Sequence, residues 1–226
     1  MKHPKGPSSR RGYHHGNLRE ALVAAALDLI SEKGPAGFTF AEAARVAGVS
    51  PAAPYRHFRD REALLVDVAQ QGFERLAAQL AEAWNDGQPD KFAAFENIGR
   101  AYLAFARDDP ASYTAMFEAQ LPPDANPDFS RAADLAFGVV RQATEQLCAD
   151  VPPAQRPPAL MASLHVWAMS HGIASLFARG DSGRRRVPMM PEELLEAGML
   201  IYLEGLGIRQ GSGAGSGAGS GASSGG

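Results

Sequence analysis

Hydrogen-bond donors gather in one short segment of the N-terminal quarter, where Tyr55, Arg56 and His57 follow one another. Phenol, guanidinium and imidazole groups in succession suit contacts with phosphate oxygens. The sequence offers no partner at metal-ligand spacing from His57, and it contains no ordered Ser/His/Asp set, paired carboxylates or phosphate-binding glycine loop. The residues therefore favour binding of a polyanion over an enzyme, a metal site or a bound cofactor.

The charge of the chain is unevenly spread. Residues 1–62 carry ten basic and six acidic side chains, a charge of +4. Because the whole chain has a net charge of −3, the remaining residues carry −7. A polyanion would therefore be held at the N-terminal end. The single cysteine, Cys148, excludes an intramolecular disulfide and a Cys-rich zinc site. With neither a signal-like apolar run nor an apolar stretch of membrane-spanning length, we expect a cytoplasmic protein with no membrane partner.

Almost every segment has helical periodicity, which predicts an all-α protein with about nine helices. The expected ranges are 17–33, 39–48, 51–58, 60–84, 91–108, 110–120, 127–149, 154–179 and 191–206. They divide the chain into a flexible basic arm (1–16), a three-helix helix-turn-helix domain (17–62), a helical domain (63–209) and a disordered Gly/Ser/Ala tail (210–226).

Helix start and stop signals define the helix-turn-helix unit, and Asn17 and Asp60 are the expected N-caps of the first and fourth helices. Thr39 and Glu42 have the spacing of a capping box, and Gly48 permits the sharp turn that follows. Ser50 and Pro51 then form an N-cap and a first-turn proline, which predicts a short third helix to about Phe58.

This stretch resembles the reading head of the tetracycline-repressor (TetR) family of regulators. The shared pattern is Thr39, the Ala-Gly-Val-Ser turn over 47–50, and Tyr-Arg-His-Phe over 55–58, and the resemblance runs continuously over residues 17–65. It implies a two-fold dimer that places one recognition helix per subunit in successive major grooves of a palindromic operator, about 34–36 Å apart.

Carried over position by position, the resemblance assigns DNA contacts within the head. Thr39, Ser50, Tyr55 and His57 would anchor the phosphate backbone, and Arg61 stands where the family usually has a phosphate-binding lysine. The expected DNA-binding residues are Thr39, Ser50, Pro51, Ala52, Ala53, Tyr55, Arg56, His57 and Arg61, with Arg10 and Arg11 as a minor-groove arm.

The head also departs from the family pattern. Ala52 and Ala53 face base edges in the family, where alanines touch only thymine methyl groups. Pro54 replaces a usual leucine and removes an early hydrogen bond of the recognition helix. Arg56 could instead be a solvated surface charge, and the arginine arm could be idle. Specificity then rests on Tyr55, Arg56, operator shape and, where it contacts DNA, the Arg10–Arg11 arm.

The remaining helices are rich in aromatic residues. The family resemblance implies an effector pocket among them, lined by Phe95, Tyr102, Phe105, Tyr113, Met116, Phe117, Trp167 and His171. An aromatic stripe at helical spacing is more often the pattern of plain core. Trp167, His171 and Gly172, with Tyr13–Arg19, resemble the subgroup with a WHG domain.

Helices 154–179 and 191–206 are apolar all round, which predicts burial on more than one side. By the resemblance, they would pair across the two-fold axis as a homodimer. The function expected is a ligand-responsive regulator, a repressor in this family's usual manner, released from double-stranded operator DNA by a small, largely apolar effector. The alternative is a helix-turn-helix regulator without an effector, controlled by a protein partner or by abundance.

Overall fold

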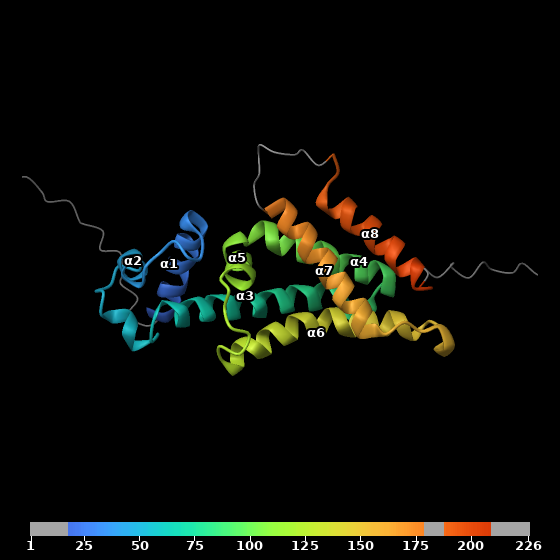
Figure 1. Ribbon diagram of the computed structural model, residues 1–226, viewed down its shortest axis with the longest axis horizontal. Helices are drawn as coiled ribbons and strands as arrows, with labels where there is room; N and C mark the ends of the chain where they lie inside the picture. Colours follow the sequence, from blue (N-terminus) through green and yellow to red (C-terminus); the bar gives the residue numbers. More distant parts are fainter. Residues whose placement is uncertain (1–17, 179–187, 209–226) are drawn as a thin grey trace, which may run out of the picture.

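The computed structural model describes residues 18–178 and 188–208. Within these ranges every regular element is a helix, which confirms the all-α prediction (Figure 1). The arm and tail, with Arg10, Arg11 and the Asn17 cap, lie outside the described residues. The α-helices are α1 (Leu18–Lys33), α2 (Phe40–Val46), α3 (Arg61–Trp84), α4 (Lys91–Asp108), α5 (Pro110–Glu118), α6 (Pro127–Ala149), α7 (Ala159–Ala178) and α8 (Pro191–Gly205).

Three short 3₁₀ helices complete the described part of the chain: η1 (Ala53–Arg56), η2 (Asn85–Gly87) and η3 (Pro153–Gln155). The expected third helix is therefore present as η1 and not as an α-helix. Pro54 has no amide to reach the Ser50 carbonyl, which instead accepts from Ala53 at 3.0 Å in the tighter i+3 pattern.

The head consists of α1, α2 and η1, and it lies at one end of the long helix α3 (Figure 1). The capping box of α2 is confirmed: Thr39 Oγ1 accepts from the Glu42 amide at 3.2 Å, and the Thr39 amide donates to Glu42 Oε2 at 2.8 Å. Gly48 has a φ of +72°, so it supplies the left-handed turn that ends the helix.

Helix α3 is the spine of the molecule. Asp60 caps it by accepting from the Ala63 amide at 2.9 Å, as predicted, and Trp84 near its far end is buried. The helix starts in the head and then packs against α4, α5 and α6 along the body (Figure 1). A single rigid element therefore connects the head to the body.

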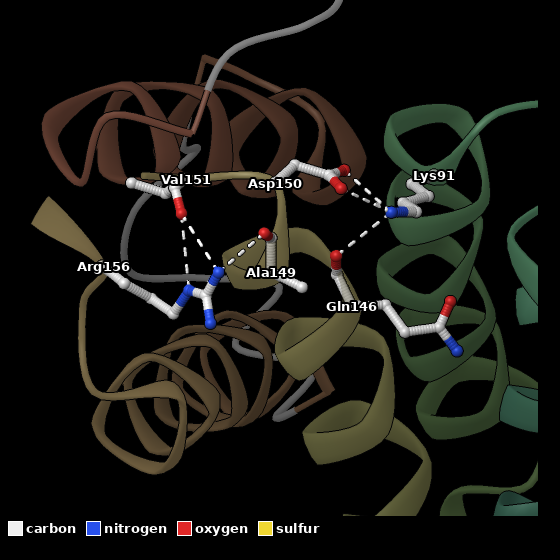
Figure 2. A network of polar contacts seen from close by, with 6 residues as sticks. All are labelled: Lys91, Gln146, Ala149, Asp150, Val151 and Arg156. Carbon is white, nitrogen blue, oxygen red and sulfur yellow. Dashed lines mark hydrogen bonds and ion pairs between the residues drawn. The ribbon is translucent and has the colours of Figure 1, made fainter. Parts of the chain in front are cut away.

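The C-terminal end of α6 is held by two cations (Figure 2). Lys91 Nζ donates to the Gln146 carbonyl at 3.2 Å and pairs with Asp150 at 2.8 Å, and Arg156 Nη2 donates to the Ala149 carbonyl at 2.9 Å. These carbonyls have no partner inside the helix, and positive groups favour a helix C-terminus. The network fixes the start of α4 and the approach to α7 against the end of α6.

Helix α7 begins at Ala159, five residues later than expected, because Pro157 and Pro158 cannot continue a helix from η3. Contrary to the sequence expectation, its stretch Ala159–Phe177 is long and apolar enough to cross a membrane by length and composition. It packs against α4, α6 and α8, as a core helix does, yet much of it stays exposed in the single chain.

Candidate nucleic-acid interface and ligand site

The donors predicted to contact DNA lie on the outer surface of the head. Arg56 and His57 are exposed, and the Tyr55 side chain is 63% exposed. The edge of its ring packs on Phe40, with centroids 5.0 Å apart at 84°, which restrains the phenol without burying it. The buried Phe58 anchors the segment from below. Three hydrogen-bond donors therefore face solvent from a segment that the buried Phe58 holds in place.

The reading positions differ in exposure. Ser50, Pro51 and Ala52 are exposed, whereas Ala53 is partly buried. Pro54, which stands where the family usually has a leucine, is buried. The adjacent side-chain donors Tyr55, Arg56 and His57 therefore lie at the C-terminal side of this turn.

Thr39 is already engaged by its own capping box. Its hydroxyl donates to Glu42 Oε2 at 3.0 Å, and Lys33 Nζ binds the other carboxylate oxygen at 2.7 Å. The Lys33 ammonium and the Thr39 donors lower the pKa of Glu42 to about 2. A phosphate at Thr39 would therefore compete with a carboxylate that stays charged at all ordinary pH values.

Arg61 opens α3 beneath the head, and its guanidinium carbon lies 4.7 Å from the Phe38 ring centroid. Nε and Nη2 are buried without a hydrogen-bond partner. Arg61 therefore makes a cation–π contact with Phe38 in addition to its expected phosphate role, and fewer of its nitrogens are accessible to a phosphate.

An ion pair between Arg19 on α1 and Asp67 on α3 connects the head with the spine. Arg19 donates to both carboxylate oxygens, through Nε at 3.1 Å and through Nη2, and Gln71 Nε2 adds a bond at 3.3 Å. The Asp67 side chain is only 5% exposed. Sequence reasoning missed this pair because its members are 48 positions apart.

Five of the eight predicted effector residues meet in one cluster of α4, α5 and α7. His171 Nδ1 lies 2.8 Å from the Tyr113 hydroxyl and 3.3 Å from that of Tyr102. Burial lowers the pKa of His171, which favours the neutral imidazole, and both phenol hydroxyls lie within hydrogen-bond distance of its Nδ1. The rings of Phe117 and Trp167 pack beside these residues. The Phe117 ring centroid lies 4.7 Å from that of His171, and the Trp167 centroid lies 5.2 Å from that of Tyr102.

The other three predicted residues lie apart from this cluster. Phe105 borders the α3 side of the body, Met116 packs against Gly72 of α3, and Phe95 is 1% exposed in the core. An effector-binding role stays a prediction for these three residues, and also for the five residues of the cluster.

A hollow of ≈ 380 Å³ lies beside the aromatic cluster, where α4 ends, α5 begins, α7 ends and α8 begins. It is lined by Leu103, Ala106, Arg107, Pro110, Ala174, Phe177, Pro191 and Glu192. Sequence reasoning missed these residues, since small and aliphatic side chains at helical spacing carry no signal that separates a hollow from core.

Helices α7 and α8 share an exposed apolar face. Leu164 is 50% exposed and Leu176 71% exposed on α7, and Ile201 on α8 is 72% exposed. His165 Nδ1 and the Tyr202 hydroxyl, 2.8 Å apart, join the two helices. An apolar face of this kind favours contact with another molecule.

Helices alone in the described ranges, with a helix-turn-helix head at one end of the long helix α3, define a helical DNA-binding protein. Residues 22–68 match the family described as bacterial regulatory proteins, tetR family, and residues 95–201 match the tetracyclin repressor-like, C-terminal domain. The chain belongs to the TetR family of transcriptional regulators, which are DNA-binding proteins and not enzymes.

Individual relatives agree with this assignment. The HTH-type transcriptional regulator BetI of Rhizobium meliloti (strain 1021) is 48% identical over 105 residues, 45% of this chain and 52% of BetI. The chain spans about half the length of the curated relatives it matches. A protein of unknown function from Rhodococcus sp. RHA1 is 31% identical with a TM-score of 0.73, covering 87% of this chain and 98% of that one.

The TetR family regulator PfmR of Thermus thermophilus has the same fold, with 20% identity and a TM-score of 0.63 over 81% of this chain and 97% of PfmR. The narrower resemblance to the WHG-domain subgroup stays a prediction.

Proposed function

We propose that this chain is a cytoplasmic repressor that binds a palindromic operator as a homodimer and leaves it when a small, largely apolar effector binds the body. The observation that carries the proposal is that Tyr55, Arg56 and His57 are all exposed on the head, next to the buried Phe58. Donors held in this way anchor a protein on the phosphate backbone.

The first test is specific DNA binding. Fluorescence anisotropy would compare a palindrome from upstream of the protein's own gene with a scrambled duplex of equal length. We expect binding to the palindrome at least ~1,000-fold tighter, the lower limit of ordinary specificity. Equal affinity for both duplexes would contradict the proposal.

Tyr55→Phe tests the phenol apart from the ring. The variant retains the edge contact with Phe40 and removes the donor. Because a hydrogen bond to a charged group contributes about 1.5–3 kcal/mol, we expect operator affinity to fall roughly 10–100-fold. The loss should be equal on operators that differ in base sequence, with the salt slope unchanged because no charge is lost. A change in which base is preferred would instead assign Tyr55 to base reading.

Arg61→Ala tests the phosphate role of the arginine that opens α3. We expect weaker binding to all operators and a salt slope that is smaller by about one for each phosphate that is no longer neutralised. Arg61→Lys is the matched variant, since it keeps the charge while losing the planar stacking on Phe38. An unchanged slope in Arg61→Ala, with a loss equal to that of Arg61→Lys, would mean that Arg61 acts only through Phe38.

The proposed homodimer forms through α7 and α8. Their exposed apolar side chains support it, as does Gly172 in the middle of α7. A glycine in a helix interior costs about 1 kcal/mol, and no atom lies within 4 Å of the place where its Cβ would be. Nothing described in this chain therefore requires the missing side chain, whereas close approach of a partner helix would.

A further inference from the structure

We propose that the hollow between α4, α5, α7 and α8 is the effector site, and that it takes a compact, uncharged, apolar molecule. The inference rests on the proposed function for its regulatory consequence, and on the walls of the hollow for its chemistry. At ≈ 380 Å³ the hollow falls within the usual range of ligand pockets, roughly 300–1,000 Å³.

The walls offer almost nothing to a charged ligand. Arg107 and Glu192 are the charged residues among the described lining, and they pair with each other at 3.0 Å. The other two guanidinium nitrogens of Arg107 donate to Asp108, at 2.9 Å and 3.4 Å. The guanidinium that an anionic ligand would meet is already paired with two carboxylates, and a cationic ligand would have to compete with Arg107 for Glu192.

Two positions in these walls have no backbone donor. Pro110 and Pro191, the first residues of α5 and α8, both line the hollow, and proline has no amide hydrogen. The remaining walls are the apolar side chains of Leu103, Ala106, Ala174 and Phe177. Burial of apolar surface, at about 25 cal/mol per Å², is therefore the main source of affinity available here.

The position of the hollow gives such a ligand a route to the head. Pro110 begins α5, and α5 packs against α1 of the reading head. Pro191 begins α8, which carries part of the proposed dimer face. A molecule wedged between these two helix starts can favour one arrangement of head and partner over another, provided that it binds the two states with different affinities.

The test is calorimetric titration of the full chain, without DNA, with 1-octanol, octanoate and octylammonium. We expect 1-octanol to bind at least tenfold more tightly than either charged probe. Glu192→Gln should tighten octanoate binding, because it removes one of the two carboxylates that neutralise Arg107, and should leave 1-octanol binding unchanged. Charged probes that bind the unaltered protein as well as 1-octanol does would overturn the assignment of ligand class.

Filling the hollow tests its location. Ala106→Leu should weaken 1-octanol binding at least tenfold, whereas Ala104→Leu, on the same helix but bordering the α3 side, should leave it unchanged. If Ala106→Leu does not fold by circular dichroism, Ala174→Val tests the opposite wall. Binding that survives a folded filling variant would overturn the site. Binding in the hollow without any effect on operator affinity would leave the site standing and refute the proposed regulation.

Discussion

Leu164→Glu is expected to convert the protein from a dimer into a monomer and to weaken operator binding at least ~100-fold. Leu164 lies on the exposed apolar face of α7, with 50% of its side chain exposed in the single chain. Burying an unpaired carboxylate costs several kcal/mol, and a two-fold interface buries it twice. Since ~1.4 kcal/mol is a factor of ten in affinity, dimerisation at micromolar concentration would be lost. Analytical ultracentrifugation measures the change directly.

Leu135→Glu is the matched control for this prediction. Leu135 is 56% exposed, but it lies on α6, outside the face formed by α7 and α8. The control should remain a dimer and bind the operator as the unaltered protein does. If Leu164→Glu stays dimeric while Leu135→Glu dissociates, the interface lies on α6 and the proposed one is wrong.

Arg19→Met is expected to lower the free energy of unfolding by about 2–3 kcal/mol at neutral pH. It leaves the buried Asp67 carboxylate with the Gln71 bond at 3.3 Å in place of its ion pair. Breaking a buried pair costs about 3–5 kcal/mol, and the figure here is lower because Arg19 itself is 56% exposed. Methionine preserves the packing of the arginine stem. Urea unfolding followed by circular dichroism gives the measurement.

Two further variants test whether the loss in Arg19→Met comes from the buried charge of Asp67. Asp67→Asn should cost less than Arg19→Met, because it removes the buried charge together with the pair. Arg59→Met breaks the pair with Asp60, which is 2.8 Å long but formed by an 84% exposed arginine, so its effect should be close to zero. Equal losses in Arg19→Met and Arg59→Met would show that burial of Asp67 contributes nothing to the connection between head and spine.

Local chemistry made most of the fold predictable. The caps Thr39 and Asp60 begin their helices as expected, and Lys91–Asp108 and Pro127–Ala149 have the predicted bounds. Caps, prolines and helical periodicity act within a few residues, so a sequence displays them directly. The exposed donors of the head were likewise readable, because they are adjacent in the chain.

The errors arose where two local signals competed. Ser50 and Pro51 indicate a helix start, yet Pro54 withholds the amide that an α-helix needs, and the segment becomes η1. The expected start of α7 was also wrong: the helix begins at Ala159, after Pro158, and not within η3. Both corrections are caused by proline: Pro54 lacks the amide donor of an α-helix, and Pro157 and Pro158 keep the backbone before them out of the helical conformation.

By itself, therefore, the sequence determined an all-helical regulator with a helix-turn-helix head and the donors that this head presents. Only the tertiary structure decided that Tyr102 and Tyr113 lie within hydrogen-bond distance of His171, and that the open space lies beside them. It also decided that Asp67 is buried against Arg19. These features join residues tens of positions apart, and their energies depend on burial and distance, which a linear pattern does not contain.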